Sequence, residues 1–138
     1  MTEATRPLRV LLIEDEAIIA MMVASVIRGL GFKLVGPAAR LDHALALVAE
    51  GEFDCAVLDV NIRGGDTYCV ADLLIERDCP FVMASGYSNV IIPPHLLGRT
   101  RLTKPYSIDA LEDELMRLSE RVAAIRDKSG VVMPAPSF

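Results

Sequence analysis

The sequence lacks tryptophan and has few other aromatic residues, with Tyr 3 and Phe 4 among 138 residues. Cysteine is also scarce, because Cys55, Cys69 and Cys79 form an odd set without the spacing of metal ligands. This pattern predicts neither a disulfide framework nor a zinc site. We therefore expect the three cysteines to act as small apolar side chains in a reducing compartment.

An excess of positive charge and a membrane-spanning run are missing as well. Lys+Arg 14 against Asp+Glu 19 gives a net charge of −5, which lacks the electrostatic footprint of a nucleic-acid-binding protein. The apolar stretch 17–27 lies between Glu16 and Arg28 and is well short of the roughly 20 residues that cross a bilayer. Residues 1–7 contain no apolar signal core. We expect a cytoplasmic protein that contacts neither nucleic acid nor membrane.

The composition that remains is that of one globular domain. Hydrophobic residues make up 52% of the chain and charged residues 24%, a balance typical of a compact fold and not of a disordered chain. We assign residues 8–126 to this domain, with an N-terminal extension over 1–7 and a flexible tail over 127–138.

Short apolar runs alternate with longer segments of helical period along the chain. We expect strands at residues 8–13, 33–36, 53–58, 80–84 and 99–103, with helices between and after them. Pro93 and Pro94 leave room for only a short or distorted fourth helix. This alternation predicts right-handed crossovers and a flavodoxin-like, doubly wound (βα)5 domain of the α/β class, whose parallel five-stranded sheet has the order 2-1-3-4-5.

Polar side chains stand where each of the main strands ends. Glu14 and Asp15 follow the first strand, Asp59 the third, Ser85 the fourth and Lys104 the fifth. In an open α/β sheet, ligands bind beyond the carboxyl ends of the strands, near the point where the strand order reverses. We therefore expect three carboxylates, one hydroxyl and one ammonium group to meet at one edge of the sheet.

Such clustered carboxylates repel one another unless a proton or a cation lies between them. Two charges about 4 Å apart cost about 4 kcal/mol at an effective dielectric constant near 20. An all-oxygen site without histidine or thiolate suits Mg²⁺, or Mn²⁺, better than Zn²⁺, and the carbonyl of Asn61 could add a ligand. With Lys104 as a second positive charge, the set suits phosphoryl transfer onto a carboxylate. Asp59 is the expected nucleophile, and Ser85 can donate to a phosphoryl oxygen.

Each of these residues also has a simpler explanation when it is taken alone. An acidic residue after a strand is often a helix cap, which fits Asp15 or Glu16. Ser85 followed by Gly86 can be an ordinary turn. The indication of function lies in the combination of the groups and in their order along the chain.

The combination resembles the receiver domain of the two-component response-regulator family. The matching residues are the acidic pair Glu14–Asp15, Asp59 within Val-Leu-Asp-Val-Asn, Ser85 within Ala-Ser-Gly, and Lys104 followed by proline. Within that family, residues 61–66 and 80–87 are similar to the alphaproteobacterial stand-alone receivers with a Phe-Ala-Thr-Gly-x-Tyr motif. The motif is altered here, because methionine replaces its phenylalanine and serine its threonine.

The resemblance implies a role for each matching residue. Asp59 would accept a phosphoryl group from a histidine kinase or a histidine phosphotransfer protein. Asp15 would bind Mg²⁺ directly and Glu14 through water, with the carbonyl of Asn61 as a further ligand. Ser85 and Lys104 would contact the phosphoryl group, and the peptide bond from Lys104 to proline would be cis.

The resemblance also implies a signalling role. Such a protein is no enzyme beyond its own phosphorylation and dephosphorylation, and it acts by contact with a downstream protein or by phosphorelay. We expect a stand-alone regulator because residues 8–126 leave no room for an output domain. The last helix is a candidate surface for a homodimer.

Two features depart from the family pattern. The strand position that usually holds the switch aromatic, three residues before the lysine, holds Arg101, which leaves Tyr87 as the aromatic candidate. The pair Pro93–Pro94 disfavours a regular fourth helix, so we do not expect output through the usual face that includes that helix.

Two alternative functions stay open at this point. One is a degenerate receiver that binds partners without phosphorylation, for which glutamate at position 14 and Arg101 leave room. The other is an aspartate-nucleophile phosphatase, which typically carries a second aspartate two residues after its nucleophile as a general acid. This sequence has Asn61 at that position and no cap domain to enclose a substrate.

Overall fold

Five parallel strands form the centre of the molecule. The computed structural model describes residues 6–86 and 92–130. The sheet has the order β2-β1-β3-β6-β7, which confirms the predicted order 2-1-3-4-5 because β6 and β7 are the fourth and fifth strands of this sheet along the chain. The strands are β1 (Arg9–Ile13), β2 (Lys33–Ala38), β3 (Cys55–Asp59), β6 (Phe81–Ser85) and β7 (Arg101–Thr103).

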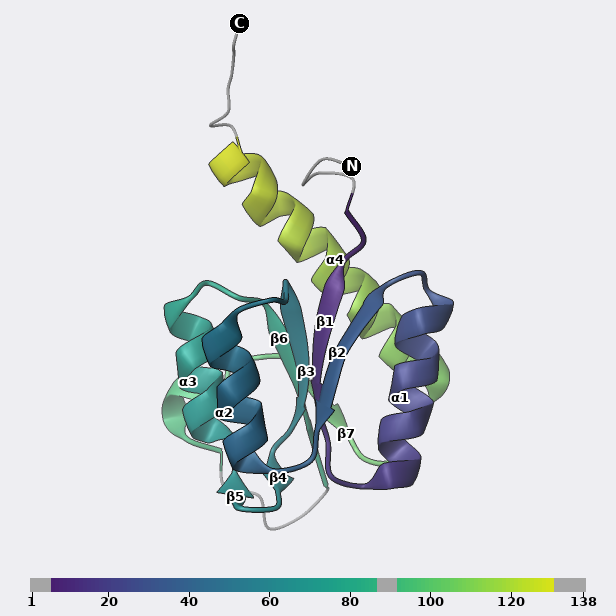
Figure 1. The fold of residues 1–138 in the computed structure, drawn as a ribbon, viewed down its shortest axis with the longest axis vertical. Coiled ribbons are helices and arrows are strands. Elements are labelled where there is room, and N and C mark those ends of the chain that lie inside the picture. The colour runs from purple at the N-terminus through teal and green to yellow at the C-terminus, as the bar shows by residue number, and fades with distance from the viewer. Residues whose placement is uncertain (1–5, 87–91, 131–138) are drawn as a thin grey trace, which may run out of the picture.

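Helices cover both faces of the sheet (Figure 1). They are α1 (Ala17–Gly29), α2 (Leu41–Glu50), α3 (Tyr68–Glu76) and α4 (Ile108–Gly130). Alternate residues of β1 point to opposite faces, so Leu11 and Ile13 pack with α2 and α3, whereas Val10 and Leu12 pack with α1 and α4. Burial on both faces explains why β1, β3 and β6 are nearly unbroken apolar runs in the sequence.

The crossover between β6 and β7 contains a 3-10 helix in its described part. This helix, η2 (Pro94–Leu96), starts at a proline and buries Leu96 against the α2 and α3 side of the core. Proline suits the first position of a helix, where no N–H bond is needed. The element agrees with the short or distorted fourth helix that the two prolines predict.

The second strand is longer than the sequence suggests. We expected it to end at Gly36, but β2 continues through Pro37 to Ala38 after a shift in its register with β1 between Leu11 and Ile13. An edge strand tolerates proline because the missing N–H can face away from the sheet. The extension lets the backbone N–H of Glu14 donate to the Ala38 carbonyl at 3.0 Å, which fixes the chain where the first acidic residue begins.

A small hairpin takes the place of the turn-rich loop expected after the third strand. Its strands are β4 (Asn61–Ile62) and β5 (Gly65–Asp66), which pair antiparallel. Gly64 and Gly65 have φ of 103° and 134°, values that side-chain-bearing residues rarely adopt. The Arg63 carbonyl accepts from the backbone N–H of Leu41 at 2.9 Å, so the hairpin is tied to the start of α2.

The last helix runs past the end of the sheet. It continues to Gly130, beyond the expected end near Arg126, and its second half projects beyond the edge at which β1 begins (Figure 1). Among the helices in the described ranges, none is both long and apolar enough to cross a membrane.

Candidate functional site

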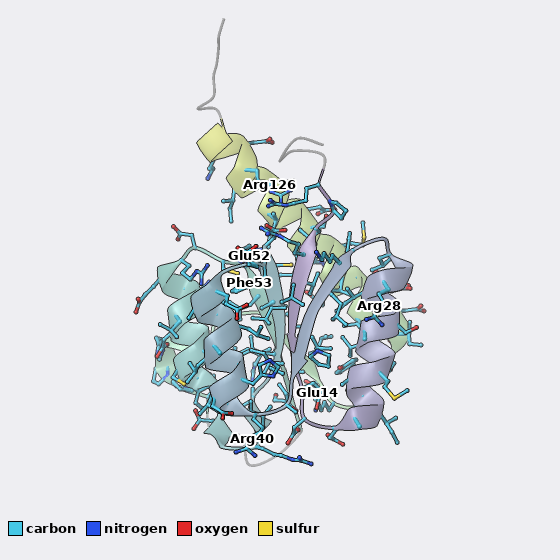
Figure 2. All side chains as sticks on the ribbon, viewed as in Figure 1. Glu14, Arg28, Arg40, Glu52, Phe53 and Arg126 are labelled. Carbon is cyan, nitrogen blue, oxygen red and sulfur yellow. The ribbon has the colours of Figure 1, made fainter. Side chains whose placement is uncertain are left out.

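The carboxyl edge of the sheet holds the predicted polar residues. Asp59 and Ser85 end β3 and β6, Glu14 and Asp15 follow β1, and Lys104 follows β7. Glu14, Asp59 and Ser85 are only 3%, 7% and 5% exposed, and Figure 2 shows Glu14 at this edge. Burying a polar side chain without a partner costs free energy. The contacts of these three residues therefore indicate the role of this edge.

The ammonium group of Lys104 lies among three carboxylates. Its Nζ is 2.8 Å from Asp59 Oδ2 and 3.2 Å from Glu14 Oε1. It also lies 3.4 Å from Oε1 of Glu16. The backbone N–H of Lys104 donates to the Ser85 carbonyl at 2.7 Å, and the following peptide bond to Pro105 is cis, as the resemblance implied. One cation is thus shared at the centre of the acidic edge.

Three acidic residues of this edge bring their oxygens close enough for a metal site. Glu14, Asp15 and Asp59 each offer one carboxylate oxygen, and these oxygens all lie within 4.8 Å of one another. An all-oxygen donor set with room for water is what Mg²⁺ and Mn²⁺ prefer. The residues present therefore fit the metal that the sequence predicts.

The charges at this edge change the protonation of their neighbours. Burial raises the pKa of Glu14 to about 7, the N–H that Glu16 donates at 3.1 Å opposes this rise, and the charge of Asp59 adds to it. Burial acts to lower the pKa of Lys104, but the hydrogen bonds and charges of Asp59 and Glu14 outweigh it and raise that pKa. Lys104 is therefore positively charged at neutral pH. Its single charge does not balance the negative charges of the carboxylates around it.

Hydrogen bonds fix both the side chain and the backbone of Asp59. The N–H of Asn61 donates to Asp59 Oδ1 at 3.2 Å, while Oδ2 faces Lys104. The hydroxyl of Thr67 donates to the Asp59 carbonyl at 2.7 Å, and the N–H of Val60 donates to the Ala84 carbonyl at 2.9 Å. These contacts fix the orientation of the carboxylate at the end of β3. The side chain of Asn61 itself is exposed.

Two residues that precede helices contact residues of the site and do not cap their helices. Glu16 is at the N-cap position of α1 and Thr67 at that of α3, yet neither side chain caps its helix. Glu16 instead contacts Lys104, and Thr67 bonds the Asp59 carbonyl. The capping explanation is therefore wrong for Glu16. The sequence analysis did not identify Thr67, because a threonine before a helix signals a cap.

The structure brings Tyr106 close to the site, where it lines a pocket together with Glu16 and Lys104, and the sequence analysis did not identify it. Burial raises the pKa of Tyr106 to about 12, and the charge of Glu14 contributes. Its position two residues after Lys104 was the available signal. Arg101 is exposed at the start of β7. Tyr87, the expected switch residue, lies outside the described residues.

A cavity opens beside the acidic edge, between α1 and β2. It measures about 740 Å³ and includes Glu14, Asp15 and Arg63 in its lining. Met21, also in the lining, is 71% exposed, and Ile18 on the same helix is 84% exposed. Large apolar side chains this exposed next to a polar site are typical of a surface that binds another protein.

Comparisons with known proteins agree with this geometry. A relative from Mycobacterium tuberculosis, the transcriptional regulatory protein PdtaR, is 30% identical over 145 residues, which cover 87% of this chain and 69% of that protein. The solution structure of SdrG from Sphingomonas melonis Fr1 is 37% identical, has a TM-score of 0.72 and covers 86% of this chain and 99% of that one.

The receiver domain of the PhyR response regulator from Erythrobacter litoralis is 26% identical, with a TM-score of 0.70, and the match covers 85% of this chain and 93% of that one. The likeness to SdrG and PhyR confirms the resemblance to the alphaproteobacterial receivers. The model of the response regulator receiver domain matches residues 10–115. The chain therefore belongs to the response regulator receiver family, whose members act in two-component signal transduction.

Proposed function

We propose that this receiver is a phosphorylation switch in which Asp59 accepts a phosphoryl group from a phosphohistidine. The observation that carries the proposal is the placement of Lys104 Nζ, 2.8 Å from Asp59 Oδ2, at an edge where Glu14 and Asp15 supply further oxygens. A lysine and a carboxylate cluster around one buried aspartate suit the stabilisation of a transferring phosphoryl group.

The chemistry of the step follows from these residues. An oxygen of the Asp59 carboxylate forms the new bond to phosphorus while the bond from phosphorus to the donor imidazole breaks. The imidazole keeps the electron pair and takes up a proton from solvent. Lys104 balances the negative charge that gathers on the phosphoryl oxygens, and the hydroxyl of Ser85, at the end of the adjacent strand, donates to one of them. The acceptor in this step is the chain's own aspartate, and the phosphohistidine is the donor.

Mg²⁺ would be held by Asp15, Asp59 and the carbonyl of Asn61, with Glu14 acting through water. When bound, the ion supplies positive charge for the phosphoryl oxygens. The contacts that Lys104 makes with Glu14 and Asp59 already compensate part of the negative charge of this edge.

A phosphodonor test examines the assignment of Asp59. Acetyl phosphate with Mg²⁺ should add one phosphoryl mass to the wild type and none to Asp59→Asn. The matched control is Asp113→Asn, which removes an exposed carboxylate from α4 and should be phosphorylated like the wild type. Modification of Asp59→Asn would contradict the assignment.

The same assay separates the two alternatives. A degenerate receiver would remain unmodified, and a phosphatase would hydrolyse a generic phosphoester over many turnovers. Neither result is expected, because Glu14, Asp15, Asp59, Ser85 and Lys104 lie at one edge in support of the proposed acceptor site, and Asn61 stands where a phosphatase has its general acid.

We also propose that the protein donor approaches over α1. Met21 lines the cavity that reaches Glu14 and Asp15, and the exposed Ile18 lies three residues before it on α1, so a helix that carries the phosphohistidine can approach Asp59 from this side. The double variant Ile18→Asp, Met21→Asp should lose transfer from a histidine kinase but keep transfer from acetyl phosphate. Leu97→Asp, at another exposed apolar residue, is the control. Equal loss with both donors would show damage to the site itself and not to docking.

A further inference from the structure

A second surface of distinct character lies at the opposite end of the sheet. It is an open groove of about 780 Å³ between the turn after α3, the residue Arg99 that precedes β7, and the projecting half of α4. Figure 2 shows this end, with Phe53 and Arg126 labelled, far from Glu14. Four basic residues line the groove against a single acidic one, Asp78, and they are Arg77, Arg99, Arg121 and Lys128.

Two of the four basic side chains are held in place by aromatic rings. The guanidinium group of Arg77 lies 5.1 Å from the centre of the Phe53 ring and donates to the Val48 carbonyl. Arg99 lies 5.7 Å from the centre of the Phe81 ring. Cation–π contacts of this kind keep a charge fixed without neutralising it. The positive wall of the groove is therefore ordered before any partner binds.

The other two basic side chains stand on the projecting part of α4. Arg121 and Lys128 are both exposed. Within the described ranges, no carboxylate forms an ion pair with Arg99, Arg121 or Lys128. The floor between these charges is apolar and includes Ile75, Pro80 and Ile125, the last of which is 39% exposed. The groove thus combines uncompensated positive charge with apolar surface.

We propose that this groove binds an acidic segment of a partner protein, one in which apolar residues are interspersed among Asp and Glu. The argument is charge complementarity, because four cations face one carboxylate in a chain whose net charge is −5. A short acidic segment satisfies these cations locally, and its apolar residues cover the floor. The groove lies at the other end of the sheet from Asp59, so the partner and the phosphodonor can bind together.

Two other occupants fit the groove less well. A nucleic acid strand would also be attracted by the cations, but the rings that support Arg77 and Arg99 are buried, at 6% and 1% exposure, and give bases no surface to stack on. The net negative charge of the rest of the chain also repels a long polyanion. Residues 131–138 follow α4 directly, yet they contain no Asp or Glu to pair with the basic residues.

A titration with a defined peptide tests the proposal on the full chain. The probe is the triplet Glu-Asp-Leu repeated four times and blocked at both ends, followed by backbone amide NMR shifts. We expect saturable binding with shifts centred on the groove. The double reversal Arg121→Glu, Lys128→Glu should weaken binding at least about fivefold, because two exposed attractions become repulsions.

Matched controls make the result specific. Arg28→Glu, Lys33→Glu changes the net charge equally at exposed positions on α1 and β2 and should bind the peptide like the wild type. The peptide with Gln and Asn in place of its acids should not bind, and Asp59→Asn should bind normally, so the result is independent of phosphorylation.

Four outcomes would overturn the proposal. These are the absence of saturable binding, an equal loss of binding in the control reversal, tighter binding of a twelve-base oligothymidine than of the acidic peptide, and peptide binding that appears only after residues 131–138 are deleted. The third outcome would assign the groove to nucleic acid, and the fourth to the chain's own terminal segment.

Discussion

The two ends of the sheet differ in their balance of carboxylates and cations. At the carboxyl edge, Glu14, Glu16 and Asp59 share the single ammonium group of Lys104. At the amino edge, the carboxylate of Asp54 is surrounded by arginines: it accepts from the backbone N–H of Arg9 at 2.8 Å, and guanidinium groups of Arg9, Arg6 and Arg126 lie 3.1, 3.3 and 3.1 Å from its Oδ1. One edge is short of positive charge and the other has it in excess.

The contrast separates a site built for binding from one built for stability. Asp54 joins segments from the start, the middle and the end of the chain, so its partners hold the fold together. The carboxylates around Lys104 repel one another, and this repulsion persists until a divalent cation or a proton relieves it. Uncompensated charge at a strand end is therefore a better indication of function here than charge alone.

The largest expected effect on stability comes from removing the central carboxylate of the amino edge. Asp54→Asn should lower the free energy of unfolding by about 2–3 kcal/mol, because it leaves several partly buried guanidinium groups without an anion. Urea denaturation measures this change. Asp113→Asn, on the exposed side of α4, should change it by less than about 0.5 kcal/mol. A similar small change in Asp54→Asn would contradict the structural role of the network.

The pH dependence of that variant sharpens the comparison. Burial alone would raise the pKa of Asp54, but the hydrogen bonds and charge of Arg9, with Arg126, outweigh it and lower the pKa below 3.8. A lowered pKa adds stability that is fully present above pH 3.8 and is lost as the pH falls through the folded-state pKa. The difference in the free energy of unfolding between wild type and Asp54→Asn should stay constant from pH 7 to 5 and become smaller below pH 4. A difference that grows as the pH falls would contradict a lowered pKa for Asp54.

The carboxyl edge should respond to a divalent cation where the amino edge does not. With Mg²⁺ at about ten times its dissociation constant, the wild type should gain about 1.4 kcal/mol in the free energy of unfolding, and a chelator should reverse the gain. Asp15→Asn should show no stabilisation by Mg²⁺. Asp54→Asn should be stabilised by the same amount as the wild type, although its free energy of unfolding without Mg²⁺ is lower. Thermal or urea denaturation with and without Mg²⁺ measures both. Retention of the full gain in Asp15→Asn would remove that residue from the metal site.

The smallest expected effect concerns the cation already present. Lys104→Ala should leave the affinity for Mg²⁺ unchanged or raise it by less than about tenfold, because it removes a positive charge that competes for Glu14 and Asp59. Phosphorylation of the same variant should be slower. Isothermal titration gives the affinity, with Arg28→Ala as a surface control. A large loss of Mg²⁺ binding would mean that Lys104 holds the carboxylates in position for the ion and does not merely compete with it for them.

The order of the sheet could be predicted because burial on both faces leaves a clear pattern. The strands β1, β3 and β6 are short apolar runs, whereas the edge strands β2 and β7 are partly exposed and were predicted from weaker runs in the same alternation with helices. The hairpin β4–β5 could not be predicted in this way, because two-residue strands carry no periodicity and the two glycines indicate a loop equally well. The continuation of β2 through Pro37 depends on its edge position, which is a property of the whole sheet.

The core of the site followed from strand ends alone, whereas its supporting contacts did not. We could predict that Glu14, Asp15, Asp59, Ser85 and Lys104 lie at one edge, because parallel strands bring their carboxyl ends together. The contact from Thr67 to the Asp59 carbonyl joins a helix start to a strand end, and no local spacing predicts it. The network of Asp54 was missed for the same reason, since Arg6, Arg9 and Arg126 come from distant segments.

The final helix begins four residues after Lys104 and extends past the far end of the sheet. Its 23 residues form a rod about 35 Å long at about 1.5 Å per residue. A tilt of about 10° at its first turn therefore swings the opposite tip by about 6 Å, by the same length. The same length means that a change in the angle of the helix near Lys104 would be felt most strongly at its far tip, where Lys128 lines the basic groove.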